Sequence, residues 1–169
     1  INNDKFVAGK TVDDYMFSSS QGWVSGDASG KVSFANIGDQ TSVTISAVPR
    51  QGGTTYQTLI KLKGWWVNNG NHTNIWLAAN ALCHAKNDGY NLPGITNLTS
   101  GENKRTQGSL YGEWGNVGAF SSNSQFTPGA YWTSESDDYS RHYYVQMLTA
   151  MTGRDADSTP QLTACRKSL

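Results

Sequence analysis

Apolar and polar residues alternate with a period of two in three segments of the first 64 residues, at 31–35, 43–47 and 56–62. Because successive side chains of a β-strand point to opposite faces, this alternation predicts three strands that each bury one face. The side chains expected to share a buried face are Val43, Ile45 and Ala47 in one strand and Tyr56, Thr58, Ile60 and Leu62 in another. Clusters rich in Gly, Asp and Asn separate the segments and favour hairpin turns, so we expect an antiparallel β-sandwich segment.

A helical period replaces the alternation after residue 64. The residues expected on the buried face of this helix are Ile75, Ala78, Ala79 and Leu82. Thr73 or Asn74 is the expected N-cap. Lys86 in the last turn and the sequence Asn-Asp-Gly at 87–89, which tolerates the left-handed conformation, predict where the helix ends.

A second, shorter helix is predicted at 107–114, and strands return at 130–134, 142–148 and 161–165. The strand at 142–148 is largely apolar or aromatic on both faces, which predicts a central strand that is covered on each side. A strand-only half followed by helices and strands is not one repeating unit. The pattern therefore indicates two modules, an all-β segment over residues 1–64 and an α+β domain over residues 65–169.

Composition narrows the class of protein. The chain has 169 residues, of which 37% are hydrophobic and 15% charged, and 13 basic residues balance 13 acidic ones. This is long enough for one ordinary core or two small ones, and the zero formal charge provides no electrostatic attraction for nucleic acid or anionic lipid. No apolar run approaches the roughly 18 residues that cross a bilayer. The chain begins at Ile1, which we interpret as a piece of a larger protein or a mature form.

Two cysteines, Cys83 and Cys165, stand far apart in the sequence without the close spacing typical of zinc or redox sites. A single long-range disulfide is the simplest interpretation, and two unrelated buried thiols are the alternative. Low charge with abundant Gly, Ser, Thr, Asn and Trp favours an extracellular setting, in which a disulfide persists.

The second module resembles the C-type-lectin-like fold in four segments that occur in the expected order. Residues 76–83 (Trp-Leu-Ala-Ala-Asn-Ala-Leu-Cys) resemble its first helix with its cysteine, and 89–93 (Gly-Tyr-Asn-Leu-Pro) the turn that follows. Residues 131–135 resemble its characteristic strand, and 162–166 its closing strand. In that fold the cysteine of the closing strand pairs with the cysteine of the first helix, so the resemblance implies a Cys83–Cys165 disulfide.

Two further segments are similar to the C-terminal adhesion domain of the invasin/intimin family of inverse autotransporters, in particular its invasin adhesion-domain branch. They are residues 110–116 (Leu-Tyr-Gly-Glu-Trp-Gly-Asn) and 129–135 (Gly-Ala-Tyr-Trp-Thr-Ser-Glu). In this family the lectin-like head follows immunoglobulin-like repeats, and residues 1–64 resemble a shortened last repeat. The resemblance covers most of the chain, and it is more specific from about residue 65 onward.

The resemblance implies a function at the bacterial surface. We expect the monomeric tip of an outer-membrane adhesin, facing the extracellular space and binding a host surface or serum protein, with an integrin-like receptor or an immunoglobulin as examples. A glycan-binding module that works by aromatic stacking without calcium is one alternative, and a structural cap of the adhesin stalk is another. Membership of the family would imply that the chain binds a partner, but it would not identify that partner.

Candidate contact residues come from two predicted loops that combine charge with an aromatic anchor, as interface centres often do. They are Asp137, Asp138, Tyr139 and Arg141 in one loop and Arg154, Asp155 and Asp157 in the other. The alternative is that these charges are simply solvated. The expected structural core of the head is Trp76, Leu92, Trp114 and Trp132.

Signals for enzymatic or metal chemistry are weak, and we expect no catalytic residue, no metal site and no cofactor. The calcium-binding triplets of carbohydrate-binding lectins, Glu-Pro-Asn or Gln-Pro-Asp and Trp-Asn-Asp, do not occur in this sequence. His72, His84 and His142 are scattered, without the spacing of a zinc site and without a serine nucleophile coupled to them in sequence. A cysteine held in a disulfide is not a nucleophile.

Overall fold

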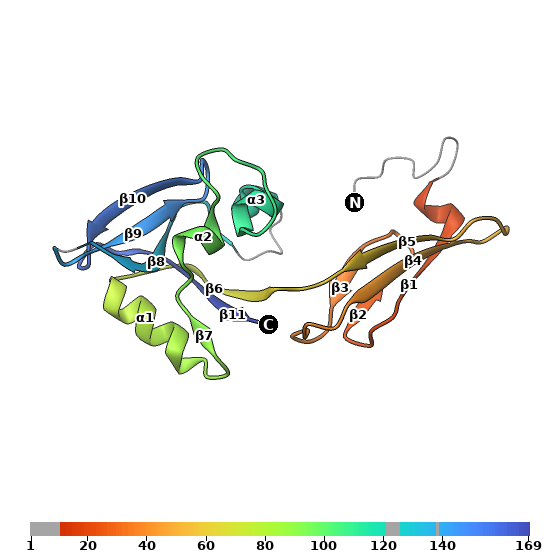
Figure 1. The fold of residues 1–169 in the computed structure, drawn as a ribbon, viewed down its shortest axis with the longest axis horizontal. Coiled ribbons are helices and arrows are strands. Elements are labelled where there is room, and N and C mark those ends of the chain that lie inside the picture. Colours follow the sequence, from red (N-terminus) through yellow and green to blue (C-terminus); the bar gives the residue numbers. More distant parts are fainter. Residues whose placement is uncertain (1–10, 121–125, 138) are drawn as a thin grey trace. The chain divides into compact units, whose positions relative to one another are not determined.

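A computed structural model describes residues 11–120, 126–137 and 139–169. The chain divides into two compact units (Figure 1). Unit 1 comprises Ile1–Trp65 and Leu169, and unit 2 comprises Trp66–Ser168. Within the described residues, no helix has the length and apolar character that a bilayer crossing requires.

Unit 1 consists of short antiparallel strands, as the alternation predicts. After a 3-10 turn at Val12–Asp14, one sheet has the order β1 (Tyr15–Ser19), β4 (Val43–Pro49), β5 (Tyr56–Ile60), and a separate hairpin joins β2 (Val24–Gly26) to β3 (Val32–Phe34). Its core cluster contains Val24, Val43 and Ile45, with Trp23, Val32 and Ile60 packed against it.

The predicted burial is correct for one strand of unit 1 and only partly correct for another, in which Ile60 packs against the core cluster. Val43, Ile45 and Ala47 of β4 are buried, which confirms the predicted face. In β5, however, Tyr56 and Thr58 are exposed. β5 is an edge strand whereas β4 lies between two strands, so alternation alone overestimates how much an edge strand buries.

Unit 2 contains a six-stranded sheet with helices around it. Its elements are β6 (Gly64–Asn74), α1 (Trp76–Ala85), β7 (Tyr90–Asn91), α2 (Ile95–Leu98), α3 (Leu110–Trp114), α4 (Val117–Phe120), β8 (Ala130–Ser136), β9 (Arg141–Gln146), β10 (Met151–Ala156) and β11 (Gln161–Ser168). The sheet order is β10-β9-β8-β11-β6, with β7 paired to β11 outside this path. β8 runs parallel to β11, while β9 is antiparallel to both β8 and β10.

The two faces of this sheet are covered by different helices. On one face, α2 and α3 contribute to the main core, whose buried residues are Leu98, Leu110, Tyr111, Tyr131, Val145, Met147, Ala150, Leu162 and Ala164. On the other face lies α1, which contacts β8 and β11 (Figure 1). β9 is internal and faces both layers, because Val145 enters the main core and His142 stacks on Trp76 of α1. This confirms the prediction of a central strand.

Helix α1 ends as predicted but begins later and buries a face that agrees only in part with the predicted one. Asn87, Asp88 and Gly89 all have positive φ, which confirms the predicted end. The N-cap is Ile75, without a side-chain cap, because β6 continues through Thr73 to Asn74. The buried residues of the helix are Ala79 and Cys83, whereas Ile75 and Ala78 are exposed. The predicted face is therefore correct for Ala79 and wrong for Ile75 and Ala78, because the buried residues Ala79 and Cys83 lie four positions apart on the helix.

A disulfide joins α1 to β11. The sulfur atoms of Cys83 and Cys165 are 2.04 Å apart, their Cα atoms are 5.3 Å apart, and 82 positions separate them in the sequence. Both cysteines are fully buried. The bond that the resemblance implied is thus present, and it ties the helix on one face of the sheet to a strand inside the sheet.

Helix α3 is shorter than predicted, and its tryptophan lies outside the core. It begins at Leu110 rather than Gln107, where the side chain of Ser109 accepts a hydrogen bond from the backbone N–H of Gly112. Leu110 and Tyr111 enter the main core, but Trp114 in the last turn is 63% exposed. The prediction that Trp114 is a core residue is wrong, because the core takes only the first two residues of this five-residue helix. Trp132 and Leu92 are buried, and Trp76 is half-buried.

Candidate functional site

Strands β9 and β10 bring the candidate contact residues together at one end of unit 2. Asp137 and Tyr139 lie in the β8–β9 turn and Arg141 opens β9. Asp138 falls outside the described residues. Arg154 and Asp155 are part of β10, so the predicted loop is wrong for these two, whereas Asp157 follows the strand. β10 is an edge strand without apolar alternation, which is why its sequence resembles a loop.

The β9–β10 register sorts the candidates into two groups. Arg154 lies opposite Tyr143, Asp155 opposite His142, and Ala156 opposite Arg141. Directly opposed residues share a face and neighbours along a strand do not. Arg141, Tyr143 and Arg154 therefore lie on one face of the hairpin, and His142 with Asp155 on the other, which is the α1 face.

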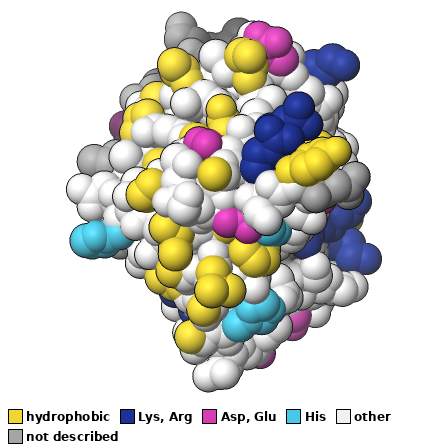
Figure 2. Space-filling view, turned by 90° about the vertical axis from the view of Figure 1, so that its left-hand side faces the viewer, with side chains coloured by type: hydrophobic (Ala, Val, Ile, Leu, Met, Phe, Trp, Pro, Cys, Tyr) yellow, Lys and Arg dark blue, Asp and Glu magenta, His cyan; other side chains and the backbone are white. Residues whose placement is uncertain are grey.

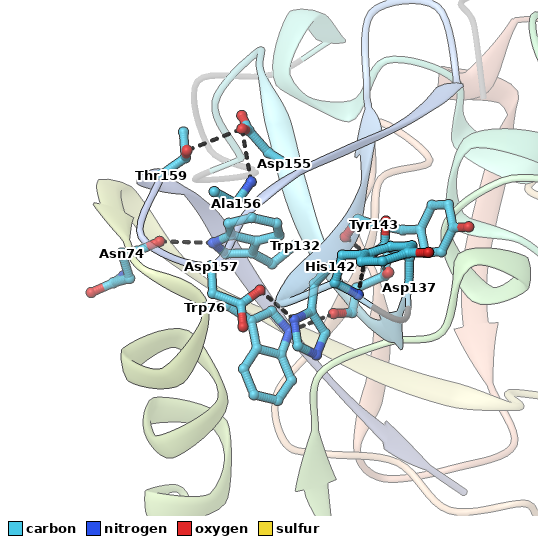
Figure 3. Close-up of polar contacts among 12 residues, drawn as sticks. Asn74, Trp76, Trp132, Asp137, His142, Tyr143, Asp155, Ala156, Asp157 and Thr159 are labelled. Atoms are coloured by element: carbon cyan, nitrogen blue, oxygen red, sulfur yellow. Dashed lines mark hydrogen bonds and ion pairs between the residues drawn. The ribbon is translucent and has the colours of Figure 1, made fainter.

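On the α1 face, Asp157 is held by structural contacts. Its Oδ1 atom lies 2.6 Å from Nδ1 of His142, whose ring stacks on Trp76 with the ring centroids 3.6 Å apart (Figure 3). The backbone of Asp157 also accepts a hydrogen bond from the N–H of Trp76 and donates one to the carbonyl of Ser140. Asp157 thus joins the start of α1 to the hairpin.

The carboxylate of Asp155 is also hydrogen-bonded within the unit. One carboxylate oxygen accepts hydrogen bonds from the backbone N–H of Ala156 and from the hydroxyl of Thr159, at 2.9 and 3.0 Å (Figure 3). The other accepts from the side-chain amide of Gln161 at 3.2 Å. These contacts brace the turn between β10 and β11, and they leave little capacity for a partner.

Two tryptophans fix the same face. The indole N–H of Trp132 donates to the carbonyl of Asn74 at 2.8 Å, and that of Trp76 donates to the carbonyl of Thr133 at 2.9 Å (Figure 3). Each ring buries a large apolar surface while its polar atom is satisfied. The α1 face is therefore a structural contact zone.

The opposite face is built around one carboxylate. Oδ2 of Asp137 lies 2.5 Å from Nη2 of Arg141 and 3.6 Å from Nη1 of Arg154, and Oδ1 accepts the backbone N–H of Tyr139 at 3.0 Å. Burial disfavours ionisation of Asp137, but the hydrogen bond and the charge of Arg141 outweigh it, so the pKa of Asp137 lies below its usual value. We call Asp137, Tyr139, Arg141, Tyr143 and Arg154 the arginine–tyrosine surface.

Exposure differs sharply within the arginine–tyrosine surface. The side chain of Asp137 is only 8% exposed, whereas Tyr139 is 77% exposed and the side chain of Arg154 54%. The guanidinium carbon of Arg141 lies 5.8 Å from the centre of the Tyr139 ring. Figure 2 views this end of unit 2, and Lys and Arg side chains gather on its right-hand side while hydrophobic ones occupy the middle and left. A buried anion thus organises exposed cations and an exposed aromatic ring.

Two other features bear on the alternatives. Among the hydrogen bonds of the described residues, His142 pairs with Asp157 and none connects it to a Ser, Thr or Cys side chain. A cleft of about 420 Å³ lies elsewhere in unit 2, lined by residues that include Asp88, Asn91, Ser134, Arg166 and Lys167. Its lining contains no aromatic side chain, which stacking on a sugar ring would require.

Sequence reasoning missed two residues of this site. The sequence places Tyr143 in a strand, and its membership of the arginine–tyrosine surface follows only from its register with Arg154. In the sequence His142 stands apart from the other histidines, whereas in the structure it pairs with Asp157. The apolar and aromatic residues on both faces of 142–148 indicate a strand but do not indicate which strand pairs with it.

Comparison with known proteins finds relatives that match most of the chain. Residues 3–60 match the family described as Invasin, domain 4. The chain is 42% identical over 149 residues to the inverse autotransporter adhesin YeeJ of Escherichia coli (strain K12), a match that covers 88% of this chain and 6% of that protein. The fold is similar to the crystal structure of invasin, a bacterial integrin-binding protein, with a TM-score of 0.77 and 21% identity over 94% of this chain and 31% of that one. This likeness confirms the fold class, a C-type-lectin-like α+β domain after an immunoglobulin-like segment.

Proposed function

We propose that this chain, which belongs to the invasin/intimin family of inverse autotransporter adhesins, is a receptor-binding head that contacts a host surface or serum protein through the arginine–tyrosine surface. The chain spans only 6% of the length of its E. coli relative. Any activity of a full-length adhesin is therefore part of this proposal. We further propose that residues 65–169 form the head, that residues 1–64 form the last part of the stalk, and that both lie outside the outer membrane as a monomer.

One observation carries the proposal: Tyr139 is 77% exposed although its surroundings fix its position. Its backbone N–H is bound by Asp137, and Arg141 packs over its ring. Tyr and Arg are enriched among the residues that dominate protein interfaces, and an aromatic ring that is already ordered loses little entropy on binding. Such a ring is a suitable anchor for a protein partner.

The experiment measures binding of the fluorescently labelled chain to cultured mammalian epithelial cells and to immobilised serum proteins. Tyr139→Ala is expected to weaken binding by about tenfold or more, as for a residue that dominates an interface, and to leave the melting temperature unchanged. Trp114→Ala is the matched control, because it removes another exposed aromatic ring from the same unit.

Each result separates the candidate functions. Equal binding of the Tyr139→Ala variant and the wild-type chain would remove the arginine–tyrosine surface from the proposal. Binding that survives protease treatment of the cells but not removal of their glycans would favour the glycan-binding alternative. Absence of binding to any host surface would favour the structural cap.

A further inference from the structure

We infer that the arginine–tyrosine surface recognises a carboxylate of its partner, an Asp or Glu side chain displayed beside an apolar or aromatic residue on a protein surface. This inference rests on the proposed function and specifies the chemistry of the partner.

The first step is the charge balance on this face. Arg141 and Arg154 share the single carboxylate of Asp137, which leaves one positive charge in excess among the described residues of the surface. The described acidic residues nearest to Arg154 along the chain do not compensate for it, and Asp138 lies outside the described residues. Asp155 and Asp157 belong to the α1 face and are engaged with Thr159, Gln161 and His142.

The second step concerns the hydrogen-bond donors of Arg154. Its contact with Asp137 measures 3.6 Å, which is an ion pair but too long for a hydrogen bond. The guanidinium of Arg154 has no other polar contact among the described residues, and the side chain is 54% exposed. A guanidinium presents paired N–H donors in one plane, a geometry that matches the two oxygens of a carboxylate. Arg154 is therefore able to bind a partner carboxylate in bidentate fashion.

The third step explains why the ligand is a protein carboxylate rather than a polyanion. Sulfated polysaccharides bind where many cations gather, whereas this surface has two arginines around an aspartate that would repel a dense run of negative charge. The exposed ring of Tyr139 and the half-buried ring of Tyr143 add apolar area beside Arg154. One acidic side chain flanked by an apolar one complements both features.

The test uses charge reversal in the full chain with a matched control. Arg154→Glu is expected to weaken cell binding by about tenfold or more, because it opposes the partner carboxylate with a like charge. Lys104→Glu changes the net charge by the same amount at another exposed position of unit 2 and is expected to change binding by less than about twofold. Thermal melts of both variants establish that they fold.

The target side is tested on fixed cells. Amidation of cell-surface carboxyl groups and protease treatment are each expected to abolish binding of the wild-type chain, whereas removal of sialic acid or of sulfated glycosaminoglycans leaves it intact. If sialidase or heparinase abolishes binding instead, a glycan acid is the ligand and the inference is overturned. If binding persists after amidation and in Arg154→Glu, the proposed function stands and the carboxylate inference fails. If the wild-type chain binds no cells, the proposed function fails first and the inference with it.

Discussion

The two faces of the β9–β10 hairpin use the same kinds of residue for different purposes. On the α1 face, Asp155 and Asp157 have their carboxylates bound within the unit, and His142 pairs with Asp157 and stacks on Trp76. On the other face, Arg154 and Tyr139 are exposed, and among the described residues the guanidinium of Arg154 has only a 3.6 Å ion pair with Asp137. The difference shows that neither charge nor exposure alone marks a contact residue. What distinguishes the second face is unused hydrogen-bonding capacity next to an ordered aromatic ring.

The largest expected effect comes from removing the Cys83–Cys165 disulfide, which holds α1 against the sheet. A Cys83→Ala, Cys165→Ala double variant, or reduction of the wild type, loses the entropic restraint on a loop of 82 residues, which is worth about 4.5 kcal/mol of unfolding free energy in the chain-entropy model. We expect calorimetry to show a large fall in the melting temperature of unit 2. A reductant should have no effect on the double variant. Melting of the reduced wild type within a degree or two of the oxidised form would contradict the role given to the bond.

A smaller test compares one residue from each face. Asp157→Ala removes the partner of His142 Nδ1, a half-buried polar atom, and we expect it to lower the free energy of unfolding by about 1–3 kcal/mol. Arg154→Ala, on the exposed face, should change it by less than about 0.5 kcal/mol. Chemical denaturation followed by tryptophan fluorescence measures both. Equal losses would show that the two faces do not differ in structural role.

The smallest expected effect is the dependence of stability on pH from Asp137. Its pKa in the folded chain lies below the usual 3.8, because Arg141 favours the charged form more than burial opposes it. The stabilisation is therefore fully present above the usual value and is lost as the pH falls through the lowered folded value. We expect melting temperatures to fall more steeply with acid in the wild type than in Asp137→Asn. Asp27 and Asp39 of unit 1, whose pKa values are also lowered, are present in both proteins, so the difference between the two curves reports Asp137. Parallel curves would contradict the assignment.

Much of the fold could be predicted from local sequence, because it depends on local chemistry. The end of α1 follows from three residues that accept positive φ, and the buried face of β4 follows from alternation within a strand that has neighbours on both sides. Predictions failed where long-range context decides the outcome. The start of α1 was misplaced because β6 extends to Asn74, whose carbonyl is bound by Trp132, 58 positions later. Trp114 was misjudged because the burial of a side chain in a short helix depends on where its neighbours end.

The candidate site was predicted as a set of residues but not as an arrangement. The sequence identifies Tyr139, Arg141 and Arg154 as candidate contact residues. It does not indicate that Arg154 belongs to an edge strand and lies opposite Tyr143. It also cannot separate Arg154 from Asp155, which are adjacent in sequence and lie on opposite faces of the hairpin. Strand register makes that division, and register is fixed by pairing between segments rather than by either segment alone.

Under the proposed function, in which the head continues from β6 and binds its partner through Tyr139, the disulfide has a mechanical consequence. Tension between those two points runs along the chain to Cys83 and then crosses to Cys165, because Tyr139 lies inside the covalent loop. From Cys165 the path back to Tyr139 is about 26 residues, compared with about 56 from Cys83 directly, so at about 3.4 Å per residue the bond shortens the greatest possible extension by roughly 100 Å. A partner pulled away by flow would thus meet a short tether even after the packing around β9 had given way.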